Sequence, residues 1–71
     1  MIEMNLKLGQ YRVRYAVSVS SEGHWRVLRW IKYTTEWEDQ TIVSADQADI
    51  RKAKHDMHRD LRSLRASGIY R

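Results

Sequence analysis

The sequence contains no cysteine and no proline, and only three of its 71 residues are glycine. Without cysteine, neither a disulfide nor a thiolate metal site can stabilise the fold. No apolar run approaches the roughly 20 residues of a membrane span. The first nine residues alternate apolar and polar types, unlike the continuous apolar stretch of a signal peptide. We therefore expect one cytoplasmic domain over residues 1–71, with no cofactor and no membrane partner.

Positive charge is in excess, and it is unevenly distributed along the chain. The formal net charge is +4. Residues 1–35 carry six basic and two acidic side chains, residues 36–50 carry five acidic and no basic ones, and residues 51–71 carry seven basic and two acidic ones. This balance is compatible with nucleic acid or an acidic protein as the partner, and by itself selects neither.

Residues 11–33 predict a β-hairpin. From Tyr11 to Ser20, β-branched and aromatic residues alternate with polar ones, as in a half-buried strand. The loop at residues 21–23 ends in glycine, which favours a type I turn closed by a left-handed residue. The second strand then runs from His24 to Tyr33.

The three-residue loop fixes which residues of the two strands face each other. It places Tyr11 opposite Tyr33 and Val17 opposite Val27, so apolar side chains meet on one face. Tyr15 falls opposite Arg29 on the same face, where a cation–π pair would fit.

Two further segments have strand character. A short third strand is predicted at residues 40–44, after a turn near residues 36–39. Residues 2–8 alternate in phase until Gly9 interrupts the pattern. They form either a further edge strand or the beginning of a long first strand that bends at Gly9.

Residues 45–67 predict a helix. At the start of the helix, Ser44 followed by Gln47 forms a capping-box pattern. At its end, Gly68 suits a left-handed C-terminal cap, after which Ile69 would pack back against Leu64. The apolar stripe of this helix consists of Ile50, Ala53, Met57, Leu61 and Leu64. The stripe needs a partner, so we expect an α+β fold in which a small antiparallel sheet of three or four strands packs against one C-terminal helix.

The other face of the hairpin carries the strongest functional signal. Arg12 falls opposite Lys32, and like charges in this position destabilise a sheet unless an anion meets them. Cations hold phosphates, and an aromatic ring such as that of Trp30 can stack on a base. The candidate nucleic-acid contacts are Arg12, Arg14, Arg26, Trp30 and Lys32 on the sheet, with Arg51 and Arg62 on the helix.

Two alternatives remain open for this face. The acidic residues at 36–39 would neutralise it if a neighbouring strand placed them alongside. Alternatively, Leu28 and Trp30 exposed together indicate a surface for a partner protein or for a homodimer. The residues of that alternative interface are Leu28, Trp30, Glu36, Trp37, Glu38 and Asp39.

Signals for catalysis are weak. The chain has no cysteine nucleophile, no phosphate-binding glycine loop and no serine elbow. His55 and His58 share a helix face, but the sequence places no third metal ligand near them. We therefore expect a small non-enzymatic nucleic-acid-binding accessory or regulatory domain. The alternative is a protein-interaction module or small inhibitor of bacterial or phage type.

The segments EGHWRVLRWIKY and TIVSADQADIRKAKHDM resemble the N-terminal arm-binding domain of tyrosine integrases. In both, a glycine-turn hairpin with an aromatic strand precedes a short strand and a capped helix. The resemblance covers residues 11–67. It implies an AP2-like three-stranded sheet that docks in the DNA major groove, with Arg12, Arg14, Arg26, Trp30 and Lys32 as the DNA contacts.

Overall fold

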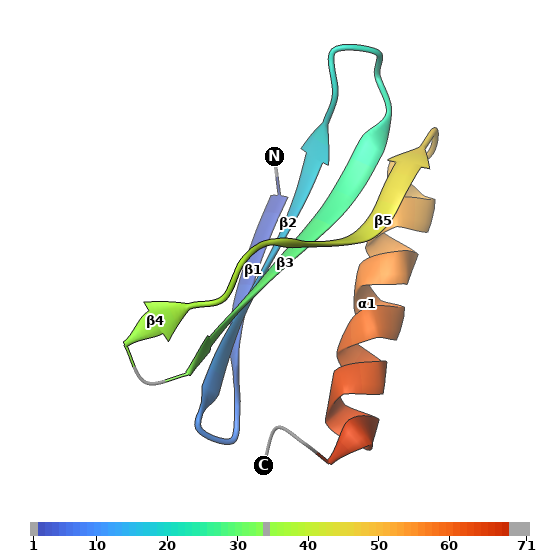
Figure 1. Ribbon diagram of the computed structural model, residues 1–71. Helices are drawn as coiled ribbons and strands as arrows, with labels where there is room; N and C mark the ends of the chain where they lie inside the picture. Colours follow the sequence, from blue (N-terminus) through green and yellow to red (C-terminus); the bar gives the residue numbers. More distant parts are fainter. Residues whose placement is uncertain (1, 34, 69–71) are drawn as a thin grey trace.

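The computed structural model describes residues 2–33 and 35–68. Figure 1 shows an antiparallel sheet with one helix, α1, against one of its faces. The fold is α+β, as the sequence predicts. The elements are β1 (Ile2–Leu8), β2 (Tyr11–Val19), β3 (Trp25–Tyr33), β4 (Glu36–Trp37), β5 (Thr41–Gln47) and α1 (Ile50–Ser67).

The β2–β3 hairpin has the predicted register. Tyr11 lies opposite Tyr33 and Val17 opposite Val27, with no shift along the nine paired residues. Ser20 closes the loop, since its backbone amide donates to the His24 carbonyl at 2.8 Å. Gly23 has a φ of 81°, a left-handed conformation that the loop needs and that glycine adopts without strain.

The question left open for residues 2–8 is settled by the pairing of β1. This segment is a separate edge strand, antiparallel to β2 along its whole length, from Ile2 opposite Val17 to Leu8 opposite Tyr11. Gly9 occupies the turn with a φ of 57°. The glycine therefore ends one strand and reverses the chain instead of bending a single longer strand.

The region after β3 contains more strand than the sequence predicts. The segment at 36–39, predicted as a turn, begins with the short strand β4, which pairs with the end of β3. The third predicted strand, at 40–44, is β5 and continues to Gln47. β5 pairs with the first half of β3 through an irregular register, and Asp46 takes a positive φ of 58° there.

The predicted start of the helix is wrong. The helix begins at Ile50 and not near residue 45, and its N-cap is Asp49, whose carboxylate accepts from the Arg51 amide at 2.9 Å. Ser44 and Gln47 form no capping box because both lie in β5. Their side chains instead donate to the Asp56 carboxylate of α1, at 2.7 and 3.0 Å.

The end of the helix is as predicted. Gly68 caps it with a φ of 73°, the left-handed conformation expected of a C-terminal glycine. Ile69, predicted to pack back on Leu64, lies outside the described residues.

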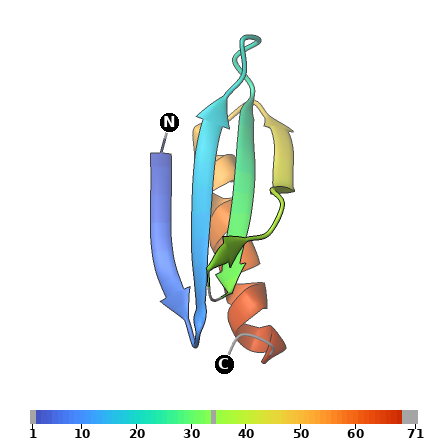
Figure 2. The same cartoon turned by 60° about the vertical axis from the view of Figure 1, so that its left-hand side comes forward.

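The core lies between α1 and the face of the sheet that it covers. Tyr15, Val17 and Val27 are fully buried there. The helix stripe packs on them, with Ala53, Met57, Leu61 and Leu64 buried and Ile50 half-buried. α1 lies mainly over β5 and β3, and Figure 2 shows β1 standing apart from it at the opposite edge of the sheet.

A polar cluster links the sheet to the helix inside this interface. The Tyr15 hydroxyl donates to Asp60 at 2.5 Å, and the Arg29 guanidinium contacts both oxygens of the same carboxylate, at 2.8 and 2.7 Å. The sequence pairs Tyr15 with Arg29 but does not reveal this shared acceptor on α1. Burial, followed by the bond to Asp60, raises the pKa of the Tyr15 hydroxyl well above its ordinary value.

Candidate nucleic-acid interface

The face of the sheet that α1 leaves open carries a row of three cations. Lys7 on β1 lies opposite Arg12 on β2, and Arg12 lies opposite Lys32 on β3. Neighbouring strands are about 4.8 Å apart, so the three side chains start close together. Directly opposed like charges destabilise a sheet. The row therefore favours an anion as its partner.

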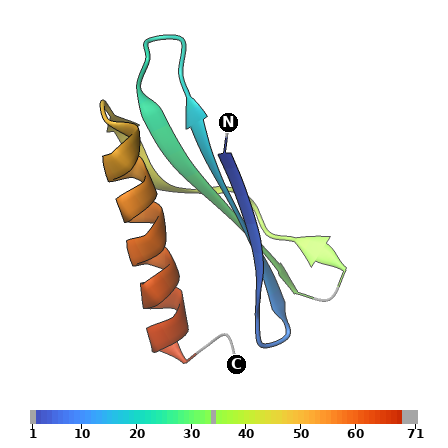
Figure 3. The same cartoon turned by 180° about the vertical axis from the view of Figure 1, so that it is seen from behind.

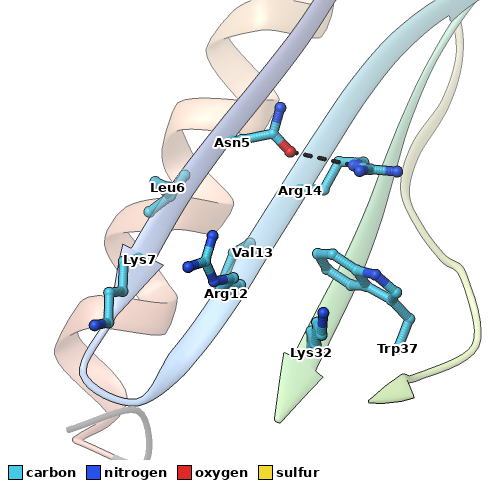
Figure 4. A pocket seen from close by; sticks show the side chains of 8 residues that line it. All are labelled: Asn5, Leu6, Lys7, Arg12, Val13, Arg14, Lys32 and Trp37. Atoms are coloured by element: carbon cyan, nitrogen blue, oxygen red, sulfur yellow. Dashed lines mark hydrogen bonds between the residues drawn. The ribbon is translucent and has the colours of Figure 1, made fainter. Parts of the chain in front are cut away.

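Trp37 lies beside this row and lines a groove together with its cations. Its position opposite Lys32 brings the indole beside the cations, with the Lys32 ammonium 5.6 Å and the Arg14 guanidinium carbon 5.1 Å from the ring centroid. Figure 4 shows the side chains around the hollow, whose volume is about 600 Å³. Its lining residues are Asn5, Leu6, Lys7, Arg12, Val13, Arg14, Lys32 and Trp37.

The groove is partly preorganised. Asn5 accepts a hydrogen bond from Arg14 Nε at 3.1 Å, and the guanidinium carbon of Arg14 lies over the Trp37 ring. Lys7 and Arg12 make no ion pair or hydrogen bond with any residue in the described ranges. Trp37 is 40% exposed, so part of its ring is available to a ligand.

Among the described residues, the acidic segment forms no ion pair with this face. Glu36, Glu38 and Asp39 are all exposed, and none forms an ion pair with a cation of the described part of the chain. In the two-residue strand β4, Trp37 lines the groove, whereas Glu36, which lies opposite Tyr33, does not.

The predicted nucleic-acid residues fall into three places. Arg12, Arg14 and Lys32 gather in the groove, and Trp30 lies beside them, opposite Arg14. Arg26 is near the other end of the same face, 3.8 Å from Asp46. The predicted helix contacts lie across the molecule, because α1 covers the opposite face of the sheet (Figure 3). They are Arg51 and Arg62, both exposed.

Five lining residues are missing from the predicted nucleic-acid set. Two of them, Leu6 and Val13, are apolar. Lys7 and Asn5 belong to β1, whose pairing the sequence left open, so they had no assigned position on the face. Trp37 was assigned to the alternative protein interface. The position of Lys7 on this face could have been predicted. Lys7 occupies a polar position of an alternating segment, and a glycine turn joins that segment to the strand that contains Arg12.

The residues of the alternative interface lie on β3, on β4 and in the segment that follows β4. Leu28 and Trp30 are half-buried, and Leu28 pairs with Ile42 of β5, which is 54% exposed. Trp37 belongs to the cationic groove instead. Leu28, Trp30 and Trp37 all lie on the face of the sheet that α1 leaves open.

Neither a metal centre nor a membrane span is found in the described residues. No cluster of three or more His, Cys, Asp or Glu side chains within residues 2–33 and 35–68 is arranged to hold an ion. In the same ranges, no helix has the length and apolar character needed to cross a bilayer.

The fold and this surface define a small α+β domain with a cationic, tryptophan-bearing sheet face. No protein-family model matches the chain, and no curated protein or solved structure is significantly similar to it. Its function has to be inferred from the surface itself.

Proposed function

We propose that this protein is a small non-enzymatic nucleic-acid-binding domain of accessory or regulatory type. Its binding surface is the cationic groove formed by Lys7, Arg12, Arg14, Lys32 and Trp37. The phosphate backbone meets the cations, and a base or sugar lies against the exposed part of the indole. The resemblance to the arm-binding domain of tyrosine integrases, which also places its contacts on a sheet face, supports the same proposal.

The observation that carries the proposal is the row of directly opposed cations, which has no acidic partner among the described residues. If the row served only to stabilise the fold, acidic side chains would be expected beside its cations. Elsewhere in the protein a cation does have such a partner, since Arg29 pairs with Asp60. A polyanion relieves the repulsion at several cations together. A small anion would neutralise one or two of them and would not use the groove along its length.

A salt-dependent titration tests the proposal. Binding of duplex DNA, single-stranded DNA and RNA is followed by tryptophan fluorescence over a range of salt concentrations. If four groove cations contact phosphates, log K against log salt has a slope of about −3.6 for duplex DNA. Arg12→Ala should weaken binding and reduce the magnitude of this slope by about 0.9.

Arg62→Ala is the matched control, since it removes the same charge from the helix side of the molecule. We expect it to leave the slope nearly unchanged. Equal losses for the two variants would place the contacts outside the groove. Trp37→Phe should remove most of the fluorescence response, whereas Trp25→Phe, on the helix side of the sheet, should preserve it. No binding of any of the three nucleic acids at low salt would refute the proposed function.

A further inference from the structure

The edge of the sheet formed by β1 is regular, and no other described strand covers it. All seven residues of β1 pair with β2 without a bulge, and within residues 2–33 and 35–68 β1 has no neighbour on its other side. Every second residue therefore directs its backbone amide and carbonyl groups away from the sheet. Proteins protect such edges with bulges, prolines, very short strands or charged side chains. The opposite edge is protected by its geometry, since β5 pairs irregularly and β4 has two residues. β1 has no bulge or proline and is seven residues long, and its two charged side chains, Glu3 and Lys7, are of opposite sign.

The apolar side chains of β1 are also only partly covered. Ile2, Met4 and Leu6 face the same side as the core residues of β2, yet they remain half-buried because α1 lies over the other strands. Figure 2 shows β1 at the edge of the sheet that lies away from α1. A second strand placed along this edge would satisfy the backbone groups and shield these side chains together.

The sequence of β1 is complementary to itself. When two copies of Ile2–Leu8 run antiparallel about a two-fold axis at Asn5, Glu3 of one copy lies opposite Lys7 of the other. On the helix side, the same register sets Met4 opposite Leu6 and Ile2 opposite Leu8. Sliding the register by two residues in either direction separates Glu3 from Lys7 and leaves two positions of each strand without a partner. The register that pairs the whole strand is thus the one that pairs its charges.

We propose that the protein forms a homodimer in which the β1 strands of two copies pair antiparallel about Asn5. The two sheets then join into one continuous sheet, and the two-fold axis is perpendicular to it. Each copy contributes its groove to the same face of the joined sheet, with Lys7 of both copies near the axis. The dimer presents a two-fold symmetric cationic surface about twice as wide as that of one chain.

The mass of the protein in solution, measured without nucleic acid by sedimentation and light scattering over a dilution series, tests this proposal independently of its nucleic-acid binding. We expect twice the 8.5 kDa of the chain. Glu3→Lys and Lys7→Glu should each give a monomer, because each variant places like charges opposite one another in both contacts. Glu22→Lys, which makes the same change of charge in the β2–β3 loop, should remain a dimer.

Mixing the two monomeric variants provides the decisive measurement. Glu3→Lys carries lysine at both positions 3 and 7, whereas Lys7→Glu carries glutamate at both. In the mixed pair every contact between positions 3 and 7 joins opposite charges, so a heterodimer should form although neither variant associates with itself. Recovery of the dimer also shows that both variants fold. A wild-type chain that stays at 8.5 kDa, a dimer that either single variant retains, or a mixture that stays monomeric overturns the proposal.

Discussion

Replacing Asp60 with asparagine should destabilise the protein strongly, although the residue lies outside the binding groove. Its carboxylate accepts from the Tyr15 hydroxyl at 2.5 Å and contacts the Arg29 guanidinium at 2.7 and 2.8 Å. Asparagine keeps the shape of the side chain but removes the negative charge. It also turns amide hydrogens toward Arg29 or Tyr15, so one of the two loses its acceptor.

The size of the effect follows from burial. Removing one partner of a buried ion pair costs about 3–5 kcal/mol. The side chains of Arg29 and Asp60 are 17% and 19% exposed, so water compensates a little and a loss of about 3 kcal/mol is expected. The total stability of a 71-residue domain is about 4–10 kcal/mol. A loss of about 3 kcal/mol therefore lowers the melting temperature by about 12–24 °C.

Urea and thermal denaturation followed by circular dichroism measure this loss. Tyr15→Phe removes only the hydroxyl and leaves the carboxylate with Arg29, so it should cost less, about 1.5–3 kcal/mol. Glu22→Gln, in the exposed loop, controls for the loss of a negative charge and should change stability by less than about 0.5 kcal/mol. If Asp60→Asn costs no more than this control, the cluster does not stabilise the fold and the reasoning is refuted.

Two further predictions concern alkaline pH and the end of the helix. Because burial raises the pKa of Tyr15, the folded state keeps a proton that the unfolded chain releases near pH 10, so the contribution of Tyr15 to stability should be complete below about pH 10 and decline above it. Urea midpoints at neutral and alkaline pH check this, and the fall should be smaller in Tyr15→Phe. Gly68→Ala should cost about 1 kcal/mol because alanine is strained at a φ of 73°. Its urea midpoint should shift, whereas that of Ser63→Ala, at an exposed position within the helix, should shift less.

The sheet register could be predicted because local sequence determines it. The loop at 21–23 has a length that allows few turn geometries, and one choice sets every pair of the hairpin. The alternation of Tyr, Val and Arg then selects which face is buried. The same reasoning places Arg12, Arg14 and Lys32 on one face, so most of the positive charge of the groove could be predicted from the hairpin.

The predicted helix start is wrong because Ser44 and Gln47 satisfy two patterns equally well. They match a capping box, and they also match a strand whose polar side chains reach across to a carboxylate on the helix. The choice depends on Asp56, which is nearby only after α1 has packed on the sheet. A local signal did exist, since Asp49 directly precedes Ile50, the first residue of the apolar stripe.

The place of Trp37 in the groove could not be predicted, for a different reason. Its place in the groove depends on a two-residue strand, a length at which hydrophobic alternation carries no information. The sequence of the hairpin alone identifies cations of the groove. It does not identify which of the three tryptophans reaches them, because that depends on where the chain returns to the end of β3.

The two aspartates that face the sheet from α1 also determine how far along the sheet the helix sits. An apolar stripe repeats every turn, so packing of Ala53, Met57 and Leu61 alone would tolerate a slip of about 5.4 Å. Asp56 and Asp60 are one turn apart, and each has its own partners on the sheet. If α1 slipped by one turn in either direction, at most one of the two sets of sheet partners would still meet an aspartate. The other set would meet a lysine or a leucine. Only one alignment of α1 along the sheet therefore gives both carboxylates their partners. The apolar stripe alone would not select this alignment.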